Sequence, residues 1–179
     1  MMNSPLPHID LDWTLFLDRD GVINRRIVDG YVMQWSDFEF LDGALEALAS
    51  LSEFFGRIVV VTNQQCVGKG LATEEEIGAI NQRMCQVVKC HGGRIDAVLI
   101  CPQLATDPDN YRKPNPRMAF MAKEMMPEID FSKSIMVGDG EIDVLFGINA
   151  GMTTVKVAGF SDAADYNFNS LYDFSRQIG

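Results

Sequence analysis

The sequence predicts an α/β fold, namely a doubly wound parallel sheet with helices on both of its faces. Short apolar runs rich in β-branched residues alternate with segments of helical periodicity, an order typical of βαβ units. The apolar runs are continuous rather than alternating, as expected for strands that are covered on both faces. With 179 residues, of which 47% are hydrophobic, the chain can fill one core and favours one domain over two.

The N-terminal part predicts one strand and a small flap. Residues 1–12 are expected to form a loose lead-in to a single domain over 13–179. An apolar run over 13–17 predicts the first strand, which ends at Asp18. Residues 21–42 follow neither helical nor strand periodicity, but they contain a turn signal and several aromatic residues. We therefore expect an irregular hairpin flap over the strand end, and no large cap domain.

The next elements follow in alternation. Apolar residues at helical spacing predict a helix over 43–55, and the β-branched run 57–62 predicts an interior strand. Thr73 and Glu76 form a capping box, which predicts the start of a helix that continues to a pair of glycines. The remaining predicted strands cover 97–101, 134–137 and 153–157, and the remaining helices cover 118–126 and 141–150.

Composition excludes several classes of function. A formal net charge of −10 disfavours binding to nucleic acid or to an anionic membrane. No stretch has the length of a transmembrane helix, and the N-terminus lacks a signal pattern, so a cytoplasmic location is expected. The four cysteines match no zinc-ligand spacing and are expected to be reduced thiols. The oligomeric state is left open, and no role is assigned to Cys66, Cys85 or Cys90.

Two aspartates end the first predicted strand. Side chains alternate in direction along a strand, so Asp18 and Asp20 are expected to point to the same face. Two like charges this close repel each other, and a divalent cation is the simplest compensating partner. The alternative is an ordinary Asp-Gly turn at a loop edge.

Polar residues also follow the other predicted strands. Thr62, Asn63 and Gln64 end the second strand, Lys113 lies in the loop after the third, and Asp139 follows the fourth. The carboxyl ends of parallel strands share one edge of the sheet, so these groups should converge. Carboxylate oxygens suit Mg²⁺, whereas an ammonium, a hydroxyl and an amide suit a phosphate. The sequence therefore predicts a site for a metal ion and a phosphorylated ligand.

Each of these residues also has an ordinary alternative. Thr62 suits any strand end, and Lys113 could be a solvated loop lysine. Asp139 and Asp143 could simply cap and charge the start of a helix. These alternatives are independent of one another, whereas a single site accounts for all the residues together.

Taken as a set, the four motifs resemble those of the haloacid-dehalogenase-like phosphatases. They are Asp18-x-Asp20-Gly-Val, Thr62-Asn-Gln, Lys113-Pro and Gly138-Asp139-x3-Asp143, and their order and spacing both fit. Arg19 between the two aspartates is similar to the branch that contains heptose-1,7-bisphosphate phosphatase and histidinol-phosphate phosphatase.

The resemblance implies a role for each matching residue. Asp18 would be the nucleophile and Asp20 the general acid and base. Mg²⁺ would be held by Asp18, Asp139 and the backbone carbonyl of Asp20, with Asp143 in support. The remaining expectations are phosphate binding by Thr62, Asn63 and Lys113, and substrate binding by Asp29, Gly30, Tyr31, Gln64 and Arg112.

Two departures from the family pattern affect the loop before Lys113 and the metal site. Family members commonly carry a zinc loop, but here only Cys101 remains of its ligands, and Gln103, Asp109 and Tyr111 replace the others. One thiolate cannot hold a structural zinc ion, so we expect none, with the loop held by its prolines and packing. The second departure is Gly140, where this branch usually carries a lysine or an arginine.

The expected function is Mg²⁺-dependent hydrolysis of a phosphomonoester through an aspartyl phosphate. The expected substrate is a sugar bisphosphate such as D-glycero-D-manno-heptose 1,7-bisphosphate, and histidinol phosphate is the alternative within the class. The stretch Tyr111–Pro114 also resembles polynucleotide 3′-phosphatases, although the negative charge disfavours a nucleic-acid substrate. A non-catalytic phosphosugar-binding protein is a further alternative, but a mere binder has little need for Asp20.

Overall fold

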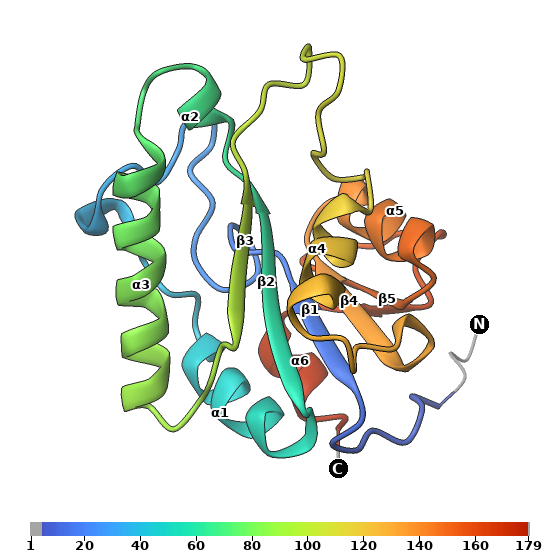
Figure 1. Cartoon of the computed structure of the whole chain (residues 1–179). Helices are drawn as coiled ribbons and strands as arrows, with labels where there is room; N and C mark the ends of the chain where they lie inside the picture. Colours follow the sequence, from blue (N-terminus) through green and yellow to red (C-terminus); the bar gives the residue numbers. More distant parts are fainter. Residues whose placement is uncertain (1–4, 179) are drawn as a thin grey trace.

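The computed structural model describes residues 5–178, and it has one six-stranded sheet in which every strand is parallel to its neighbours (Figure 1). The strand order is β3-β2-β1-β4-β5-β6, so β1 lies in the interior between β2 and β4. The strands are β1 (Thr14–Leu17), β2 (Arg57–Asn63), β3 (Ala97–Cys101), β4 (Ser134–Gly138), β5 (Thr153–Val157) and β6 (Tyr166–Phe168).

Helices cover both faces of the sheet, as the sequence predicts (Figure 1). Alternation along β1 divides the core in two: Leu15 and Leu17 belong to one apolar cluster, and Phe16 belongs to the other. The first cluster includes residues of α1 (Ala44–Phe54), α3 (Glu74–Cys90) and α6 (Leu171–Ser175). The second includes residues of α4 (Arg117–Met125) and α5 (Glu141–Ala150). Three short helical segments complete the fold, namely η1 (Trp35–Asp37), α2 (Gln65–Gly68) and η2 (Phe131–Lys133).

The five strands and four helices predicted from the sequence are all present, and their bounds differ from the predicted ones by at most two residues. The capping box at Thr73 is formed, since its hydroxyl accepts from the backbone of Glu76 and the Glu76 carboxylate accepts from the backbone of Thr73. The short segments η1, α2 and η2 were not predicted, and neither were two elements near the end of the chain, β6 and α6. They have three and five residues, too few to show a period, and β6 is specified mainly by its pairing with β5 at the sheet edge.

Residues 5–12 form no helix or strand, but they are attached to the domain. Ile9 is buried in the core, and the Tyr166 hydroxyl donates to the backbone oxygen of Pro5 at 3.0 Å. Residues 1–4 of the expected lead-in lie outside the described part of the chain. None of the helices within residues 5–178 is long and apolar enough to cross a membrane.

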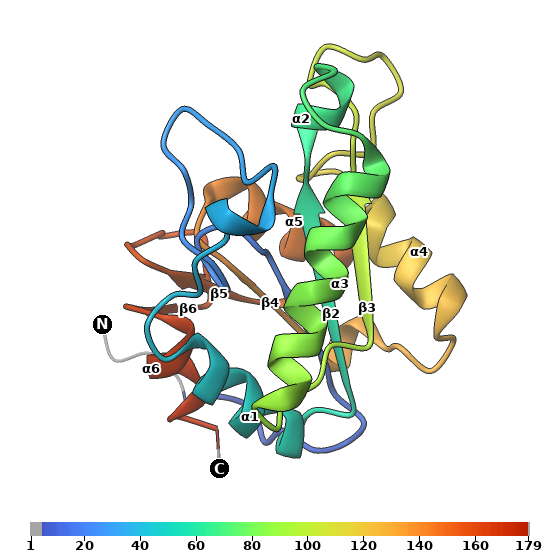
Figure 2. The same ribbon diagram turned by 90° about the vertical axis from the view of Figure 1, so that its left-hand side faces the viewer.

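The segment after β1 is held by aromatic packing rather than by a strand ladder. Isolated bridges pair Asn24 with Asp20 and with Phe40, and the rings of Trp35 and Phe38 stack with centroids 4.9 Å apart. Figure 2 shows this segment, α2 and the loop between β3 and α4 at the same end of the sheet. That end carries the carboxyl termini of the parallel strands, where open α/β sheets bind their ligands.

Candidate active site

Lys113 is the centre of charge at this edge of the sheet. Its side chain is almost fully buried, which rules out the solvated-loop alternative. Its ammonium lies 2.8 Å from Asp18 Oδ1 and 2.6 Å from Asp143 Oδ1, and it donates to the Val61 carbonyl at 2.8 Å. The ammonium therefore lies among three oxygens within 2.8 Å, one of which belongs to the candidate nucleophile.

Burial and neighbouring charges shift the pKa values of this cluster. Burial raises the pKa of Asp18 to about 7; Lys113 opposes that shift, and Asp143 adds to it. Burial by itself would lower the pKa of Lys113, but the carboxylates of Asp18 and Asp143 outweigh it and raise that pKa above its ordinary value. Burial also raises the pKa of Asp139, although Arg26 partly offsets the effect. The cluster therefore holds more carboxylates than its one buried ammonium can neutralise.

The same carboxylates fit a hard divalent cation. Oxygens of Asp18, Asp139 and Asp143 can be chosen that all lie within 4.8 Å of one another. One nitrogen of Arg26, Nη2, lies 2.6 Å from Asp139 Oδ1, 3.3 Å from the Asp20 backbone oxygen and 3.9 Å from Asp18 Oδ2. These are the three groups expected to hold Mg²⁺, so the guanidinium acts as a stand-in cation among them. Mg²⁺ prefers hard oxygen ligands and is usually bound by one or two carboxylates, a set that Asp18, Asp139 and the Asp20 carbonyl could provide.

Two glycines allow this close arrangement of carboxylates. Gly21 has a φ of +95°, and a Cβ atom at this position would collide with the Asp139 carboxylate. A Cβ atom at Gly138 would likewise collide with the side chain of Asp143. Asp143 accepts from the backbone N–H of Gly140 through Oδ2 at 3.0 Å, which leaves Oδ1 for Lys113.

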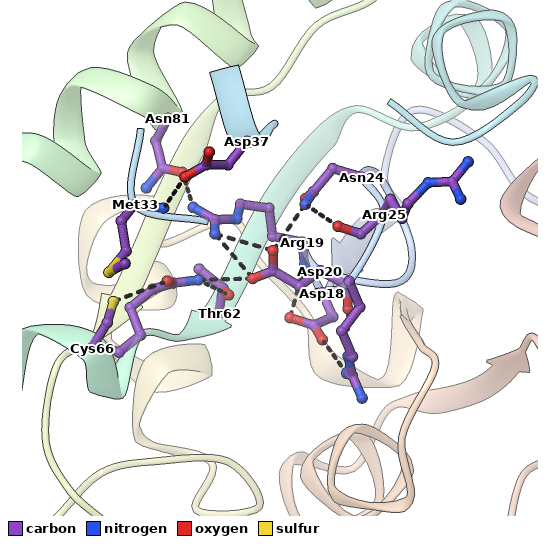
Figure 3. Close-up of polar contacts among 12 residues, drawn as sticks. Asp18, Arg19, Asp20, Asn24, Arg25, Met33, Asp37, Thr62, Cys66 and Asn81 are labelled. Carbon is purple, nitrogen blue, oxygen red and sulfur yellow. Dashed lines mark hydrogen bonds and ion pairs between the residues drawn. The ribbon is translucent and has the colours of Figure 1, made fainter. Parts of the chain in front are cut away.

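Asp20 is held by side chains on both of its oxygens (Figure 3). Arg19 Nη2 lies 3.1 Å from Oδ1 and 3.0 Å from Oδ2. Asn24 Nδ2 donates to Oδ1 and Gln64 Nε2 donates to Oδ2, each at 2.9 Å. These contacts hold the Asp20 side chain in place. It nevertheless remains 22% exposed, so a ligand can reach it.

These groups surround a cleft of about 280 Å³. Asp18 and Asp20 both line it, as the alternation of β1 predicts. Asp139 and Asp143 reach the same cluster through Arg26 and Lys113. The other predicted residues that line the cleft are Gly30, Tyr31, Thr62, Asn63, Gln64, Arg112 and Lys113, and the unpredicted ones are Arg26, Ile27, Val32, Gln65 and Ile142.

Asp29 is the one predicted site residue that the structure brings neither to the cleft nor to the carboxylate cluster. Its side chain is exposed, and its backbone has a φ of +55° at the turn before Gly30. Tyr31, two residues later, does line the cleft, and its hydroxyl contacts Gln65 Nε2 and Lys69 Nζ, each at 2.8 Å. The segment after β1 is thereby joined to α2 across the cleft.

Amide side chains position the predicted phosphate-binding groups. Asn63 accepts from the backbone N–H of Lys113 at 3.0 Å and donates to its carbonyl at 3.3 Å, so it fixes the lysine's backbone. Gln64 Nε2 donates to Thr62 Oγ1 at 2.9 Å while it also contacts Asp20. Asn63 and Gln64, expected as ligand contacts, thus also orient their neighbours.

The loop before Lys113 is organised around Gln103. Its side-chain oxygen accepts from the backbone N–H of Tyr111 at 3.0 Å, and its backbone oxygen accepts from Arg112 at 3.1 Å. This hydrogen bonding adds to the prolines and packing that the sequence suggested. Within residues 5–178 the acidic cluster at Asp18 is the only group of three metal-ligating side chains, and the lack of structural zinc stays a prediction.

Besides the unpredicted residues that line the cleft, the sequence analysis missed polar contacts of the two aspartates. Arg19 and Asn24 contact Asp20, Arg26 contacts Asp18 and Asp139, and Asn81 holds Arg19. Asn81 carried a usable signal, because it lies on the buried stripe of α3 among Ile77, Ile80 and Met84, where a polar residue needs a partner. Arg26 carried none, since its contacts depend on how the segment after β1 folds back over the strand end.

Comparisons with known proteins identify the family of this chain. A family model described as polynucleotide kinase 3 phosphatase matches residues 6–173. A D-glycero-alpha-D-manno-heptose-1,7-bisphosphate 7-phosphatase of Mycobacterium bovis is 37% identical over 93% of this chain and 92% of the relative. The D-glycero-beta-D-manno-heptose-1,7-bisphosphate 7-phosphatase of Escherichia coli is 31% identical over 92% of each chain.

A solved phosphatase structure has the same fold. D,D-heptose 1,7-bisphosphate phosphatase from B. bronchiseptica, crystallised with magnesium and phosphate, superposes with a TM-score of 0.83. The match covers 92% of this chain and 97% of that one, at 26% identity.

Proposed function

This chain belongs to the haloacid-dehalogenase-like phosphatases, in the group of the heptose-1,7-bisphosphate phosphatases, and we propose that it hydrolyses a sugar bisphosphate through an aspartyl phosphate on Asp18. One observation carries the mechanism. Asp18 lies in the cleft with one oxygen held by Lys113, while a cation position formed by Asp139, the Asp20 carbonyl and Asp18 itself adjoins the other oxygen.

The first step is attack by Asp18 on phosphorus. Bound Mg²⁺ supplies positive charge that lowers the pKa values of the carboxylates and masks their repulsion of the phosphate. Lys113 keeps its contact with Asp18 Oδ1, leaving Oδ2 as the attacking atom. After attack, Oδ1 becomes the carbonyl oxygen of the acyl phosphate, where a hydrogen bond from the ammonium favours its later hydrolysis.

Asp20 serves both halves of the reaction. Its carboxyl proton passes to the leaving oxygen as the P–O bond breaks, and its carboxylate then takes a proton from the attacking water. Thr62, Asn63 and Lys113 are the candidate ligands of the transferring phosphoryl oxygens. The free thiols of Cys66 and Cys101 suit a reducing compartment, and we place the reaction in the cytoplasm.

The cleft walls support a doubly phosphorylated sugar. Arg26 and Arg112 place two guanidinium groups in the cleft lining, which suits a second phosphate. The relatives named for heptose 1,7-bisphosphate support this sugar as the substrate, and their names divide between the α and β anomers.

The decisive experiment is phosphate release with Mg²⁺ from a panel of substrates. The panel contains both anomers of heptose 1,7-bisphosphate, the matching heptose 1-phosphate, and histidinol phosphate. We expect the 7-phosphate of the bisphosphate to be released with the highest kcat/KM. A higher kcat/KM for histidinol phosphate would replace the proposed substrate, and no turnover of any ester would overturn the proposal.

A second candidate is a polynucleotide 3′-phosphatase, favoured by the family model that matches most of the chain. The net charge of −10 opposes it, because strand binding depends on many cationic contacts. A 3′-phosphorylated oligonucleotide added to the panel tests this candidate. Release from it that exceeds release from the sugar bisphosphate, and that falls steeply with salt, would favour the second function.

A further inference from the structure

Arg19 is a fully buried cation beside the active site. Its exposure is 0%, and it is among the largest side chains that the described part of the chain buries completely. Nη2 contacts both oxygens of Asp20, and Nη1 donates to Asn81 Oδ1 on α3 at 2.9 Å. The guanidinium also lies 6.0 Å from the centre of the Phe38 ring. Figure 3 shows Arg19 reaching between Asp20 on one side and Asn81 on the other.

The ion pair of Arg19 with Asp20 indicates a role for this buried charge. A buried guanidinium is costly unless a carboxylate compensates it, and for stability alone an apolar side chain of similar size often serves as well. Among residues 5–178, Asp20 is the only carboxylate in ion-pair contact with Arg19. The cation is thus directed at the residue that must exchange a proton with the substrate.

The contacts restrict how Asp20 can turn. Three donor atoms hold its two oxygens: Arg19 Nη2 is shared between them, Asn24 donates to Oδ1 and Gln64 donates to Oδ2. Three donors on a carboxylate leave one lone pair for the proton that Asp20 exchanges. Rotation of the carboxylate would break contacts on both oxygens together. Arg19 is itself held by Asn81, which accepts a hydrogen bond from its other terminal nitrogen, Nη1. Asn81 belongs to the 17-residue helix α3 and not to the loops that follow the strands.

The same network reaches the phosphate end of the cleft. The Gln64 amide donates both to Asp20 and to Thr62 Oγ1. The position of the acid–base carboxylate is thereby joined to the position of a hydroxyl expected to bind the phosphoryl group. A displacement of about 1 Å in such a group can cost about a hundredfold in rate.

We propose that Arg19, anchored by Asn81, is a positioning residue that holds the Asp20 carboxylate in line with the leaving oxygen. This inference rests on the proposed function, because it assigns the proton transfer to Asp20. During attack by Asp18, the proton moves from the Asp20 carboxyl group to the leaving oxygen as the P–O bond breaks. During hydrolysis of the aspartyl phosphate, the carboxylate takes a proton from water and the P–O bond to Asp18 breaks.

The kinetic test uses Arg19→Lys and Asn81→Ala, with Arg94→Lys as the matched control. Arg94 is partly buried and contacts Phe55, Ser52 and Asp96, but it does not line the cleft. On the sugar bisphosphate we expect kcat to fall about a hundredfold for Arg19→Lys and about tenfold for Asn81→Ala, with KM within about twofold of wild type. Arg94→Lys should leave both constants unchanged.

The dependence of the rate on the leaving group distinguishes loss of Asp20 positioning from a general disruption of the active site. p-Nitrophenolate leaves without protonation, so the burst of p-nitrophenol released when Asp18 is phosphorylated should be nearly as fast in Arg19→Lys as in wild type. The burst with an alkyl phosphate should be slowed about a hundredfold, as in Asp20→Asn. Equal slowing with both esters, or a loss confined to KM, would overturn the positioning role.

A stability cycle tests the contact without turnover. Urea midpoints are measured for wild type, Arg19→Met, Asp20→Asn and the double variant. We expect the double variant to be more stable than the sum of the single losses, because each single variant leaves a partner unpaired. Additive losses would overturn the inference even in an active enzyme. If the Arg19 and Asp20 variants are coupled in stability but the wild-type protein hydrolyses no phosphate ester, the proposed function is wrong. The role of Arg19 in proton transfer then falls with it, whereas the contact between Arg19 and Asp20 stands.

Discussion

Asp18 owes its chemistry to neighbours that are far away in the sequence. Lys113, Asp139 and Asp143 all contribute to the pKa or the partners of this one carboxylate. Without them Asp18 would still be buried, but it would have neither an ammonium to hold one of its oxygens nor other carboxylates with which to share a metal ion. At the scale of single residues, function therefore depends on convergence at the sheet edge rather than on any one motif.

The first prediction concerns Asp18→Asn, which keeps the shape of the side chain and removes the nucleophile. Phosphate release should fall by about a thousandfold or more, since an amide does not form the acyl phosphate. Radioactive phosphate from the substrate should label wild-type protein in an acid quench and should not label the variant. Labelling of the variant, or turnover near that of wild type, would show that the covalent step uses another group.

The second prediction concerns Arg26, whose guanidinium lies among the expected metal ligands. Arg26→Gln should bind Mg²⁺ about three- to fivefold more tightly by calorimetry, because a half-exposed competing cation of this kind contributes about 1 kcal/mol or less. The control is Arg25→Gln, which removes the neighbouring arginine paired with exposed Glu39. Weaker Mg²⁺ binding in Arg26→Gln alone would mean that Arg26 supports the metal instead of competing with it.

At the scale of elements, the site is formed by the loops that follow the strands. The pairing of the strands determines where each of these loops begins. The backbone N–H of Asp18 donates to Val137 O, which continues the β1–β4 pairing beyond the last strand residue. Gly21 then turns the chain so that the following segment folds over the cleft. No side chain fits at Gly21, because a Cβ atom there would collide with Asp139, which follows a different strand.

The third prediction is that Gly21→Ala disrupts both the turn and the metal site. A side chain at positive φ costs about 1 kcal/mol or more, and the added methyl group would collide with the Asp139 carboxylate. We expect a lower unfolding midpoint together with Mg²⁺ affinity reduced by about tenfold or more. Gly70→Ala is a matched control, because Gly70 also has a positive φ, of 68°, but faces open space. If the two variants lost Mg²⁺ affinity equally, strain rather than the collision would be responsible.

The fourth prediction concerns the loop between β3 and α4. Purified protein should contain substoichiometric zinc by elemental analysis, and a zinc chelator should leave its unfolding midpoint unchanged. The reason is that Cys101, the last residue of β3, is the only thiol next to the loop, and the loop itself has none. Gln103→Ala should instead lower activity, since it removes the contact with the Tyr111 backbone just before Arg112 and Lys113. One zinc ion per chain, lost in Cys101→Ser, would refute this account of the loop.

The sequence predicts those helices and strands that are long enough to show a hydrophobic period. The interior strands, the helices and the residues at the strand ends could be predicted, because continuous apolar runs and a parallel sheet place those ends together. β6 and α6 were too short to show a period. Arg26 could not be found either, since its place among the carboxylates depends on an irregular segment whose path is set by tertiary packing.

At the scale of the whole molecule, a chain of net charge −10 has to bind an anion. It does so by placing a few cations where they act locally: Lys113 is buried beneath the nucleophile, and Arg26 and Arg112 line the cleft. The remaining negative surface disfavours long polyanions, whose binding depends on many phosphate contacts. The distribution of charge thus favours a small phosphorylated metabolite over a nucleic acid.

The last prediction concerns the stability of the metal-free and Mg²⁺-bound molecule as a function of pH. Asp18 has its pKa raised from 3.8 to about 7 in the metal-free fold, so the folded state binds more protons than the unfolded state between these values. The contribution of Asp18 to metal-free stability is therefore greatest below pH 4 and is lost as pH rises towards 7. Mg²⁺ favours the ionised carboxylates, so its stabilising effect should grow over the same interval.

The measurement is the urea midpoint at pH 5.5 and pH 8, with EDTA and with Mg²⁺. At a Mg²⁺ concentration a hundredfold above its Kd at pH 8, the gain should approach about 2.7 kcal/mol, and it should be smaller at pH 5.5. Asp139→Asn serves as the control and should remove most of the gain at both values. A gain that is equal at the two pH values in wild type would mean that the carboxylates around Lys113 are already ionised without the metal, and the charge balance described for the cluster would be wrong.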